Sequence, residues 1–217
     1  NHLTDKPFNR YYLRSVDGFV YMSEQVRGEL KAYTDAPALF SPHPLFENFG
    51  ERVERSEACV RLGLDPANRY ALFFGLIRDY KGLDLLLDAW ARLRRAGRTE
   101  GRRLIVAGEF YTAKEPYLKQ IADNGLQEEV LLHDRFIPDD DVKYYFSAAD
   151  FVVQPYKTAT QSGVTQIAYQ FCVPMVVTKV GGLAEIVPDG RVGYVCEPTP
   201  EGVAGAIERM YVNLTGL

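Results

Sequence analysis

Short apolar runs alternate with segments of helical periodicity along most of the chain, and this alternation constrains the fold more than any other feature. Strand-like runs are predicted at 70–74, 103–107, 130–132, 151–154, 175–178 and 193–196. A helical pattern follows each run, at 82–96, 117–124, 139–147, 163–171, 183–187 and 200–211. Continuous β-branched or aromatic strands, each followed by a helix, call for a parallel sheet covered on both faces. The sequence therefore predicts an α/β fold with a doubly wound parallel sheet.

The part of the chain before this series is organised differently. A strand is predicted at 18–22, and Ser23 is the expected N-cap of a helix over 24–33. Prolines then stand at positions 37, 42 and 44. Because proline lacks a backbone N–H and fixes φ, residues 34–44 are expected to form a linker without a regular element. A charged helix over 52–64 is predicted to precede the alternating series.

The charge balance argues against several classes of partner. The 217 residues include 25 basic and 29 acidic side chains, a formal net charge of -4. General binders of nucleic acid or anionic membranes carry a basic excess, so no nucleic-acid partner is expected and a bound anion must meet a local positive site. No apolar run is long enough to span a membrane, and residues 1–10 are too polar for a signal peptide, so membrane contact has no support.

Cysteine usage bears on compartment and on metals. Cys59, Cys172 and Cys196 are odd in number and widely spaced, which favours reduced thiols in a cytoplasmic protein. Neither CxxC nor HExxH occurs, so no metal site is expected. GxGxxG and GxxxxGK[ST] are also missing, which removes the main support for a dinucleotide oxidoreductase or a P-loop NTPase. Ligands of doubly wound sheets lie beyond the carboxyl ends of the strands, so the loops there are the candidate sites.

The loop after the 70–74 strand reads FFGLIRDYKG. Gly75 permits close approach of a ligand, and Arg78 and Lys81 place two cations near a helix N-terminus, a setting suited to phosphate oxygens. The alternative is an ordinary turn with two solvated charges.

The loop after the 151–154 strand lies in a stretch without acids. No carboxylate occurs between Asp150 and Glu185, as expected where a strongly negative ligand binds. Ser162 and Gly163 open a helix whose free N–H groups suit a phosphate. The alternative is the buried centre of the sheet, which does not account for the polar residues Thr158, Thr160, Gln161, Ser162, Thr165 and Gln166.

Two further loops have weaker signals. In VGGLAE, Glu185 suits the start of a helix at least as well as a ligand. In LHDRFIP, Phe136 and Ile137 are suited to flank a planar base, and Asp139 is the expected N-cap of the next helix. His133 is given no role as a base because the sequence offers it no partner.

Taken together, these loops resemble the nucleotide-sugar-binding domain of GT-B glycosyltransferases, most closely the retaining family 4 group. The marks, in family-like order, are FFGLIRDYKGLDLLLDAW, LIVAGEF, ADFVVQPY, VPMVVTKVGGLAEIV and the turn from Asp189-Gly190 to Gly193-Tyr194. The resemblance implies a Rossmann-like donor-binding domain over residues 47–217. Residues 1–46 would be the last strand and helix of an N-terminal acceptor domain, plus a linker, with the rest of that domain missing.

The resemblance also implies roles for single residues. Lys81 would hold the donor diphosphate, and Arg78 would replace the arginine that the family often has directly after the glycine, where this chain has Leu76. These two are the candidate catalytic residues. The remaining candidates would bind other parts of the donor. Arg135, Phe136 and Ile137 would hold the base, with Gly108 and Glu109 lining the neighbouring strand end, and Gly75 would let the donor approach the backbone. Gln166 would bind the ribose, Thr160, Gln161 and Ser162 would reach the sugar, and the amides of Ser162, Gly163 and Val164 would bind the phosphates.

One departure from the family pattern bears on stereochemistry. The family usually has two glutamates separated by seven residues, and alignment on Pro174 puts Ala159 and Ile167 at those places. A slip of one residue puts Thr158 and Gln166 there, again without a carboxylate. The run SGVTQIA also resembles a helix start in the inverting transferase that makes the peptidoglycan lipid intermediate. The choice between retention and inversion therefore stays open.

The implied activity is transfer of a glycosyl group from a nucleoside diphosphate sugar to an acceptor, without metal or cofactor, in polysaccharide or glycolipid synthesis. The chain by itself is expected to be inactive. A first alternative is a nucleotide-sugar-binding module without catalysis. A second is a flavodoxin-like regulatory domain that binds no sugar nucleotide, which predicts neither the acid-free loop nor the glycine turns.

Overall fold

The computed structural model describes residues 11–214, and the chain forms two compact units, Asn1–Pro44 and Leu45–Leu217. The division falls between Pro44 and Leu45, two residues before the predicted boundary between residues 46 and 47. Assignment of the first part to an acceptor domain stays a prediction. The expectation about residues 1–10 lies outside the described residues.

The first unit contains a strand, a helix and a second strand. β1 (Phe19–Tyr21) and β2 (Ala38–Phe40) pair in parallel, and α2 (Glu24–Lys31) connects them. The Ser23 hydroxyl accepts a hydrogen bond from the Val26 N–H at 3.4 Å, so the predicted N-cap is confirmed.

The prediction that residues 34–44 contain no regular element is wrong, because β2 lies inside them. The prolines flank the strand and do not interrupt it. The Pro37 carbonyl accepts from the Phe19 N–H at 2.9 Å, and the Ser41 N–H donates to the Tyr21 carbonyl at 2.9 Å. Proline is tolerated beside a strand where its missing N–H is not needed, and this short strand uses that freedom.

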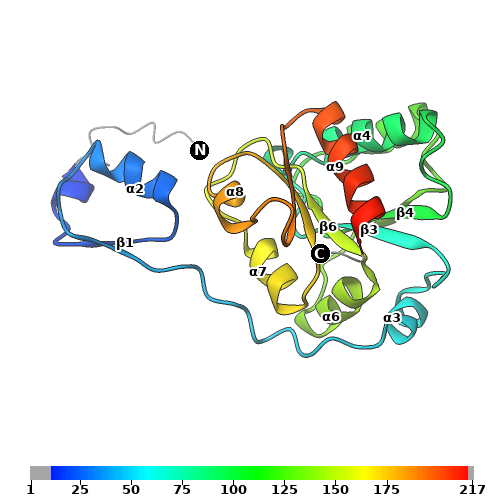
Figure 1. Ribbon diagram of the computed structural model, residues 1–217, viewed down its shortest axis with the longest axis horizontal. Helices are drawn as coiled ribbons and strands as arrows, with labels where there is room; N and C mark the ends of the chain where they lie inside the picture. The colour runs from blue at the N-terminus through cyan, green and yellow to red at the C-terminus, as the bar shows by residue number, and fades with distance from the viewer. Residues whose placement is uncertain (1–10, 215–217) are drawn as a thin grey trace. The chain divides into compact units, whose positions relative to one another are not determined.

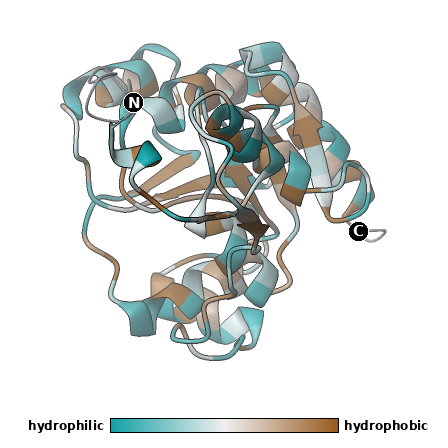
Figure 2. Cartoon of the chain, turned by 90° about the vertical axis from the view of Figure 1, so that its left-hand side faces the viewer, coloured by the Kyte–Doolittle hydropathy of each residue, from teal (hydrophilic) through white to brown (hydrophobic). Residues whose placement is uncertain are grey.

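The second unit is built on a six-stranded parallel sheet of order β5-β4-β3-β6-β7-β8 (Figure 1). Its strands are β3 (Arg69–Phe74), β4 (Arg102–Ala107), β5 (Val130–His133), β6 (Phe151–Gln154), β7 (Met175–Thr178) and β8 (Gly193–Cys196). The chain runs outward from β3 to β5 and then returns to place β6 beside β3. The predicted doubly wound parallel fold is confirmed, and the apolar colouring of the strands in Figure 2 matches burial on both faces.

Helices cover both faces of this sheet, and two apolar cores result. One core holds α4 (Leu83–Arg95), α5 (Glu115–Asp123) and α9 (Pro200–Asn213). The other holds α3 (Arg55–Leu62), α6 (Asp139–Ala148), α7 (Gly163–Gln170) and α8 (Leu183–Ile186). Figure 1 shows α4 and α9 together on one side of the sheet and α6 and α7 on the other.

Alternation along β3 divides its side chains between the two cores. Phe73 packs with the α4 side and Leu72 with the α6 side, as expected from successive side chains on a strand. The strand order reverses between β3 and β6, so the loops that follow these strands diverge from one point of the carboxyl edge. Such a point is where doubly wound sheets bind ligands.

Within the described part of the chain, no helix is both long and apolar enough to cross a membrane. The three cysteines are free thiols.

Candidate functional site

The loops after β3 and β6 are packed directly on each other at the carboxyl edge. The Lys157 N–H donates to the Tyr80 carbonyl at 2.8 Å. Gly82 has a φ of 70°, and a Cβ at this position would lie 2.0 Å from the Pro155 carbonyl oxygen. Only glycine fits this contact, which brings the start of α4 against the end of β6.

The loop after β7 packs on the same β6 loop from the other side. A Cβ at Gly181, whose φ is 53°, would lie 1.5 Å from the Ala159 carbonyl oxygen. The Gly182 N–H donates to the Thr160 carbonyl at 3.2 Å. Three glycine-containing loops, far apart in sequence, therefore form one continuous edge. The backbone of Thr160 supports this packing, while its side chain is exposed.

Gly75, Gly108, Lys81 and Val164 are brought together at the centre of this edge. A Cβ at Gly75 would lie 3.0 Å from the Lys81 Nζ and 3.6 Å from the Val164 Cγ2. A Cβ at Gly108 would lie 2.2 Å from the Gly75 carbonyl oxygen. The glycines at the ends of β3 and β4 thus let the chain approach closely beside the lysine.

Lys81 is a buried cation. It lies in a short 3₁₀ helix, η1 (Asp79–Lys81), and is only 8% exposed. Within residues 11–214 its ammonium has no hydrogen bond and no acid within salt-bridge distance; its nearest aromatic neighbour is the Tyr156 ring, 5.8 Å from Nζ to centroid. Burial, and to a lesser degree the positive charge of Arg78, lowers the pKa of Lys81 to about 8. An anion bound here would supply the missing counter-charge.

Arg78, in contrast, lies in an exposed part of the loop. Its guanidinium lies 5.1 Å from the centroid of the Tyr111 ring, in a cation–π arrangement. Its charge acts on Lys81, so the two predicted cations share one region. The structure thus separates them into a buried and an exposed cation.

The start of α7 is held by a buried polar network. The hydroxyls of Tyr156 and Ser162 lie 3.1 Å apart, and burial raises the pKa of Tyr156, so this phenol stays neutral. The Thr165 hydroxyl donates to Gln154 Oε1 at 3.1 Å. Ser162 and Thr165, two of the polar residues in the acid-free stretch, therefore serve the fold. The expectation that burial does not explain them is wrong at these two positions.

Backbone donors at this helix start remain available. No side chain caps α7 within the described chain, and the first N–H groups of a helix have no partner inside it. Gly163 faces the Phe46 ring, since a Cβ there would lie 3.4 Å from Phe46 Cε2. Val164 points toward Gly75 and Lys81. The start of α7 and the buried ammonium therefore both lie close to Gly75.

A hollow of about 180 Å³ opens beside Gly75. Its lining includes the predicted residues Gly75, Gly108, Phe136 and Ile137, together with Phe49, Phe74, Leu76, Glu109, Asp139 and Val142. Phe136 is 67% exposed at the surface, whereas Ile137 is buried. The flat apolar walls suit a planar ring.

Arg135, predicted beside these residues, does not line the hollow. The Tyr145 hydroxyl raises the pKa of the Arg135 guanidinium, which indicates that Arg135 lies toward α6. His133 lies 2.9 Å from the same hydroxyl through Nδ1, and burial lowers its pKa. His133 therefore has a structural partner. Asp139 is the first residue of α6 and not its cap, because Pro138 takes the extended conformation of the N-cap position.

The structure also shows where the residues aligned with the two family glutamates lie. Ile167 is buried in the α6-side core, and Ala159 is held against Gly181. In the other register, Thr158 is exposed, while Gln166 is 7% exposed and its side chain makes no hydrogen bond to the described residues. Gln161 is half-buried between these positions. No carboxylate enters the edge from this loop.

Sequence reasoning missed Phe49, Leu76, Val142 and Asp139 as lining residues. Leu76 directly follows Gly75, so its place in the loop could have identified it as a lining residue. Nothing in the sequence around Phe49 indicated its role, because its contact with the carboxyl edge of the sheet depends on long-range packing. Lys157, one of only two cations in the acid-free stretch, is bound by Asp84 at 2.6 Å.

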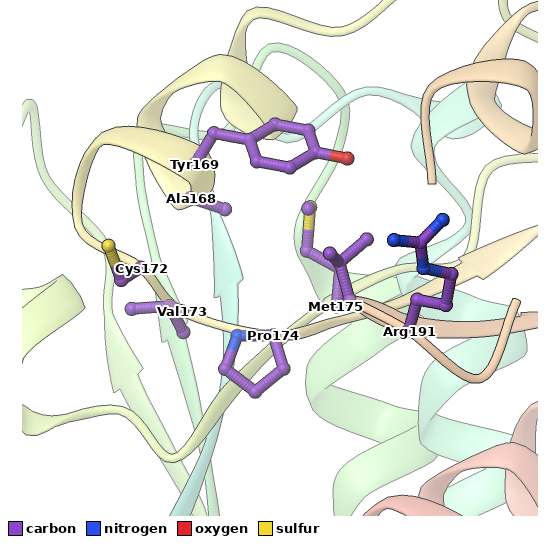
Figure 3. Close-up of a pocket in the computed structure, with 8 residues that line it drawn as sticks. Ala168, Tyr169, Cys172, Val173, Pro174, Met175 and Arg191 are labelled. Carbon is purple, nitrogen blue, oxygen red and sulfur yellow. The ribbon is translucent and has the colours of Figure 1, made fainter. Parts of the chain in front are cut away.

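A second hollow of about 250 Å³ lies at the opposite end of β7 (Figure 3). Tyr169 and Ala168 of α7 line it, with Pro174, Met175 and the side chain of Arg191. Although it is larger, its walls are mainly apolar and it lies at the amino end of the strand, away from Lys81 and the free amides. In the described residues no group of histidine, cysteine, aspartate or glutamate side chains is arranged to hold a metal ion.

The geometry defines a doubly wound domain in which a buried lysine and the start of α7 lie close together at the carboxyl edge of the sheet, and comparison with known proteins identifies the family. Residues 68–213 match the family model described as glycosyl transferases group 1. The chain therefore belongs to the group 1 glycosyl transferases.

Curated relatives extend this assignment. The chain is 31% identical over 191 residues to the lipopolysaccharide core biosynthesis mannosyltransferase LpsB of Rhizobium meliloti, which covers 84% of this chain and 51% of the relative. It is 31% identical over 144 residues to the D-inositol 3-phosphate glycosyltransferase of Pseudarthrobacter chlorophenolicus, covering 66% of this chain and 34% of the relative. The chain thus spans about half of the length of the first relative and about a third of the length of the second.

Solved structures support the fold. Sucrose-phosphate synthase from Thermosynechococcus elongatus superposes with a TM-score of 0.85 at 19% identity, covering 99% of this chain and 54% of that one. Anabaena HepE, solved in complex with UDP and glucose, gives a TM-score of 0.72 at 19% identity, covering 95% and 59%. These neighbours confirm the predicted fold, and the family-model match over residues 68–213 confirms the predicted family resemblance.

Proposed function

We propose that this chain is the donor-binding part of a glycosyltransferase that transfers a sugar from a nucleoside diphosphate sugar to an acceptor, in polysaccharide or glycolipid synthesis. The observation that carries the proposal is Lys81, a buried ammonium at the carboxyl edge without an acidic partner in the described chain. A cation buried in this way is costly unless a ligand supplies the opposite charge. The family match supports a sugar nucleotide as that ligand.

In the proposed complex the diphosphate lies between Lys81 and the first amides of α7. The Lys81 ammonium and the N–H groups of Gly163 and Val164 stabilise negative charge that develops on the departing diphosphate. Arg78 adds a second, exposed positive charge. The base enters the hollow beside Gly75. In this arrangement the protein itself stabilises the charge on the diphosphate. We therefore expect transfer by the glycosyltransferase that contains this chain to proceed in the presence of a metal chelator.

The acceptor is proposed to bind a second domain, as suggested by the partial coverage of the relatives. One observation favours binding without turnover for this chain alone: no carboxylate stands at either pair of positions that align with the family glutamates. We therefore expect the chain to bind sugar nucleotides without releasing the diphosphate. The family match argues against a flavodoxin-like regulatory domain. The cytoplasmic location stays a prediction.

Isothermal titration calorimetry of the chain with UDP, GDP, ADP and dTDP sugars tests the proposal. We expect at least one to bind, and Lys81→Met to weaken that binding by about a hundredfold, as for loss of a buried charge-assisted phosphate contact. Lys157→Met is the matched control, because this lysine is in the adjoining loop and already pairs with Asp84. No binding to any sugar nucleotide, or equal loss in both variants, would contradict the proposal.

A further inference from the structure

The hollow beside Gly75 combines apolar walls with an acidic edge. Phe49, Phe136 and Ile137 contribute apolar surface, whereas its two charged lining residues are Glu109 and Asp139. No lysine, arginine or histidine is among its lining residues. A ring that enters this hollow therefore meets hydrogen-bond acceptors and no cationic donors.

Asp139 is exposed at this edge and has one hydrogen-bond partner. It is the first residue of α6, where the helix dipole favours a negative charge. The Asn48 Nδ2 donates to its Oδ2 at 3.0 Å. Its other oxygen, Oδ1, accepts no hydrogen bond from the described residues. The carboxylate thus retains acceptor capacity toward a ligand in the hollow.

The four common bases respond differently to such an acceptor. Guanine presents two N–H donors side by side, N1–H and the N2 amino group, which match the two oxygens of a carboxylate. Uracil and thymine flank their single N3–H with carbonyl oxygens, which a carboxylate repels. Adenine and cytosine place a ring nitrogen acceptor beside their amino group. Binding of guanine is therefore favoured. Each of the other bases would place a hydrogen-bond acceptor of its own against the carboxylate oxygens, which disfavours its binding.

Resting on the proposed function, we infer that the donor nucleotide of this protein carries guanine, and that Asp139 is the residue that selects it. The apolar walls hold the ring of any base. The carboxylate of Asp139 reads the edge that distinguishes guanine, and Glu109 adds to the electrostatic preference. This assignment names the substrate class as guanosine diphosphate sugars.

Calorimetric titration of the chain with GDP, IDP, UDP, ADP and CDP tests the inference. We expect GDP to bind at least tenfold more tightly than UDP, ADP or CDP. IDP lacks the N2 amino group and should bind about tenfold more weakly than GDP, as for loss of one charge-assisted hydrogen bond. Asp139→Asn should reduce the ratio of GDP to UDP affinity to less than about threefold.

Asp140→Asn is the matched control, since it removes the same charge from the next residue, which does not line the hollow. It should leave the GDP preference unchanged. Equal or tighter binding of UDP or ADP, or a full GDP preference in Asp139→Asn, would overturn the assignment of guanine while leaving the proposed function intact. No binding of any diphosphate would overturn both.

Discussion

Lys81 and Glu129 are two charged residues with the same 8% exposure at opposite edges of one sheet. Glu129 accepts hydrogen bonds from Trp90 Nε1 at 2.9 Å, from Arg94 at 2.7 Å and from Thr99 at 3.1 Å. The Lys81 ammonium, in contrast, makes no hydrogen bond to any residue in the described part of the chain. A buried charge that the protein satisfies itself supports the fold, whereas one left for a ligand marks a binding site at the expense of stability.

The largest effect on folding is expected at the satisfied charge. Glu129→Gln removes the partner of Arg94 and one acceptor of a three-donor cluster, and should lower the free energy of unfolding by about 2–4 kcal/mol. Urea unfolding measures this change. Glu128→Gln is the control because Glu128 is exposed. If both variants were equally stable, the account of Glu129 as a buried charge that supports the fold would be wrong.

The next effect concerns the pH dependence of binding. The pKa of Lys81 is lowered to about 8, so the free protein loses this positive charge as the pH rises through that value. A diphosphate favours the protonated lysine, so affinity should be nearly full below about pH 7 and fall about tenfold between pH 7 and 9. Calorimetry in matched buffers measures the profile. Lys81→Met should give a flat profile, and an equally steep fall in this variant would assign the dependence to another group.

The smallest effect is expected at the exposed cation. Arg78→Ala should weaken binding of the diphosphate by about two- to fivefold, because an exposed charge interacts through solvent. It should also move the midpoint of the pH profile upward, since the charge of Arg78 contributes to the lowered pKa of Lys81. Arg135→Ala should change neither quantity. A loss in Arg135→Ala larger than that in Arg78→Ala would reverse this ranking.

The comparison also shows what the sequence can and cannot predict. The ranges of β6, β7 and β8 agree with the prediction because each is a continuous apolar run between turns. β2 was missed because three residues between prolines carry too weak a signal. α5 begins at Glu115, two residues before the predicted start, since Pro116 is tolerated in the first helical turn.

The location of the site follows from topology, whereas its details depend on long-range contacts. Glycines and cations after β3 lie at the carboxyl edge in any doubly wound sheet. The burial of Lys81 beside Tyr156 depends on how the β6 loop folds back. The position of Phe49 in the hollow beside Gly75 and the pairing of Asp84 with Lys157 also depend on long-range packing. No local pattern encodes these contacts.

The free energy of unfolding of Lys81→Met, measured with and without a saturating nucleoside diphosphate, tests the central claim most directly. Without ligand, the variant should be as stable as the parent chain or more stable, because an uncompensated buried charge is replaced by an apolar side chain. With ligand, the parent chain should be stabilised and the variant much less so. A variant that is more than about 1 kcal/mol less stable without ligand, yet equally stabilised by it, would show that Lys81 is a structural residue and contradict the account.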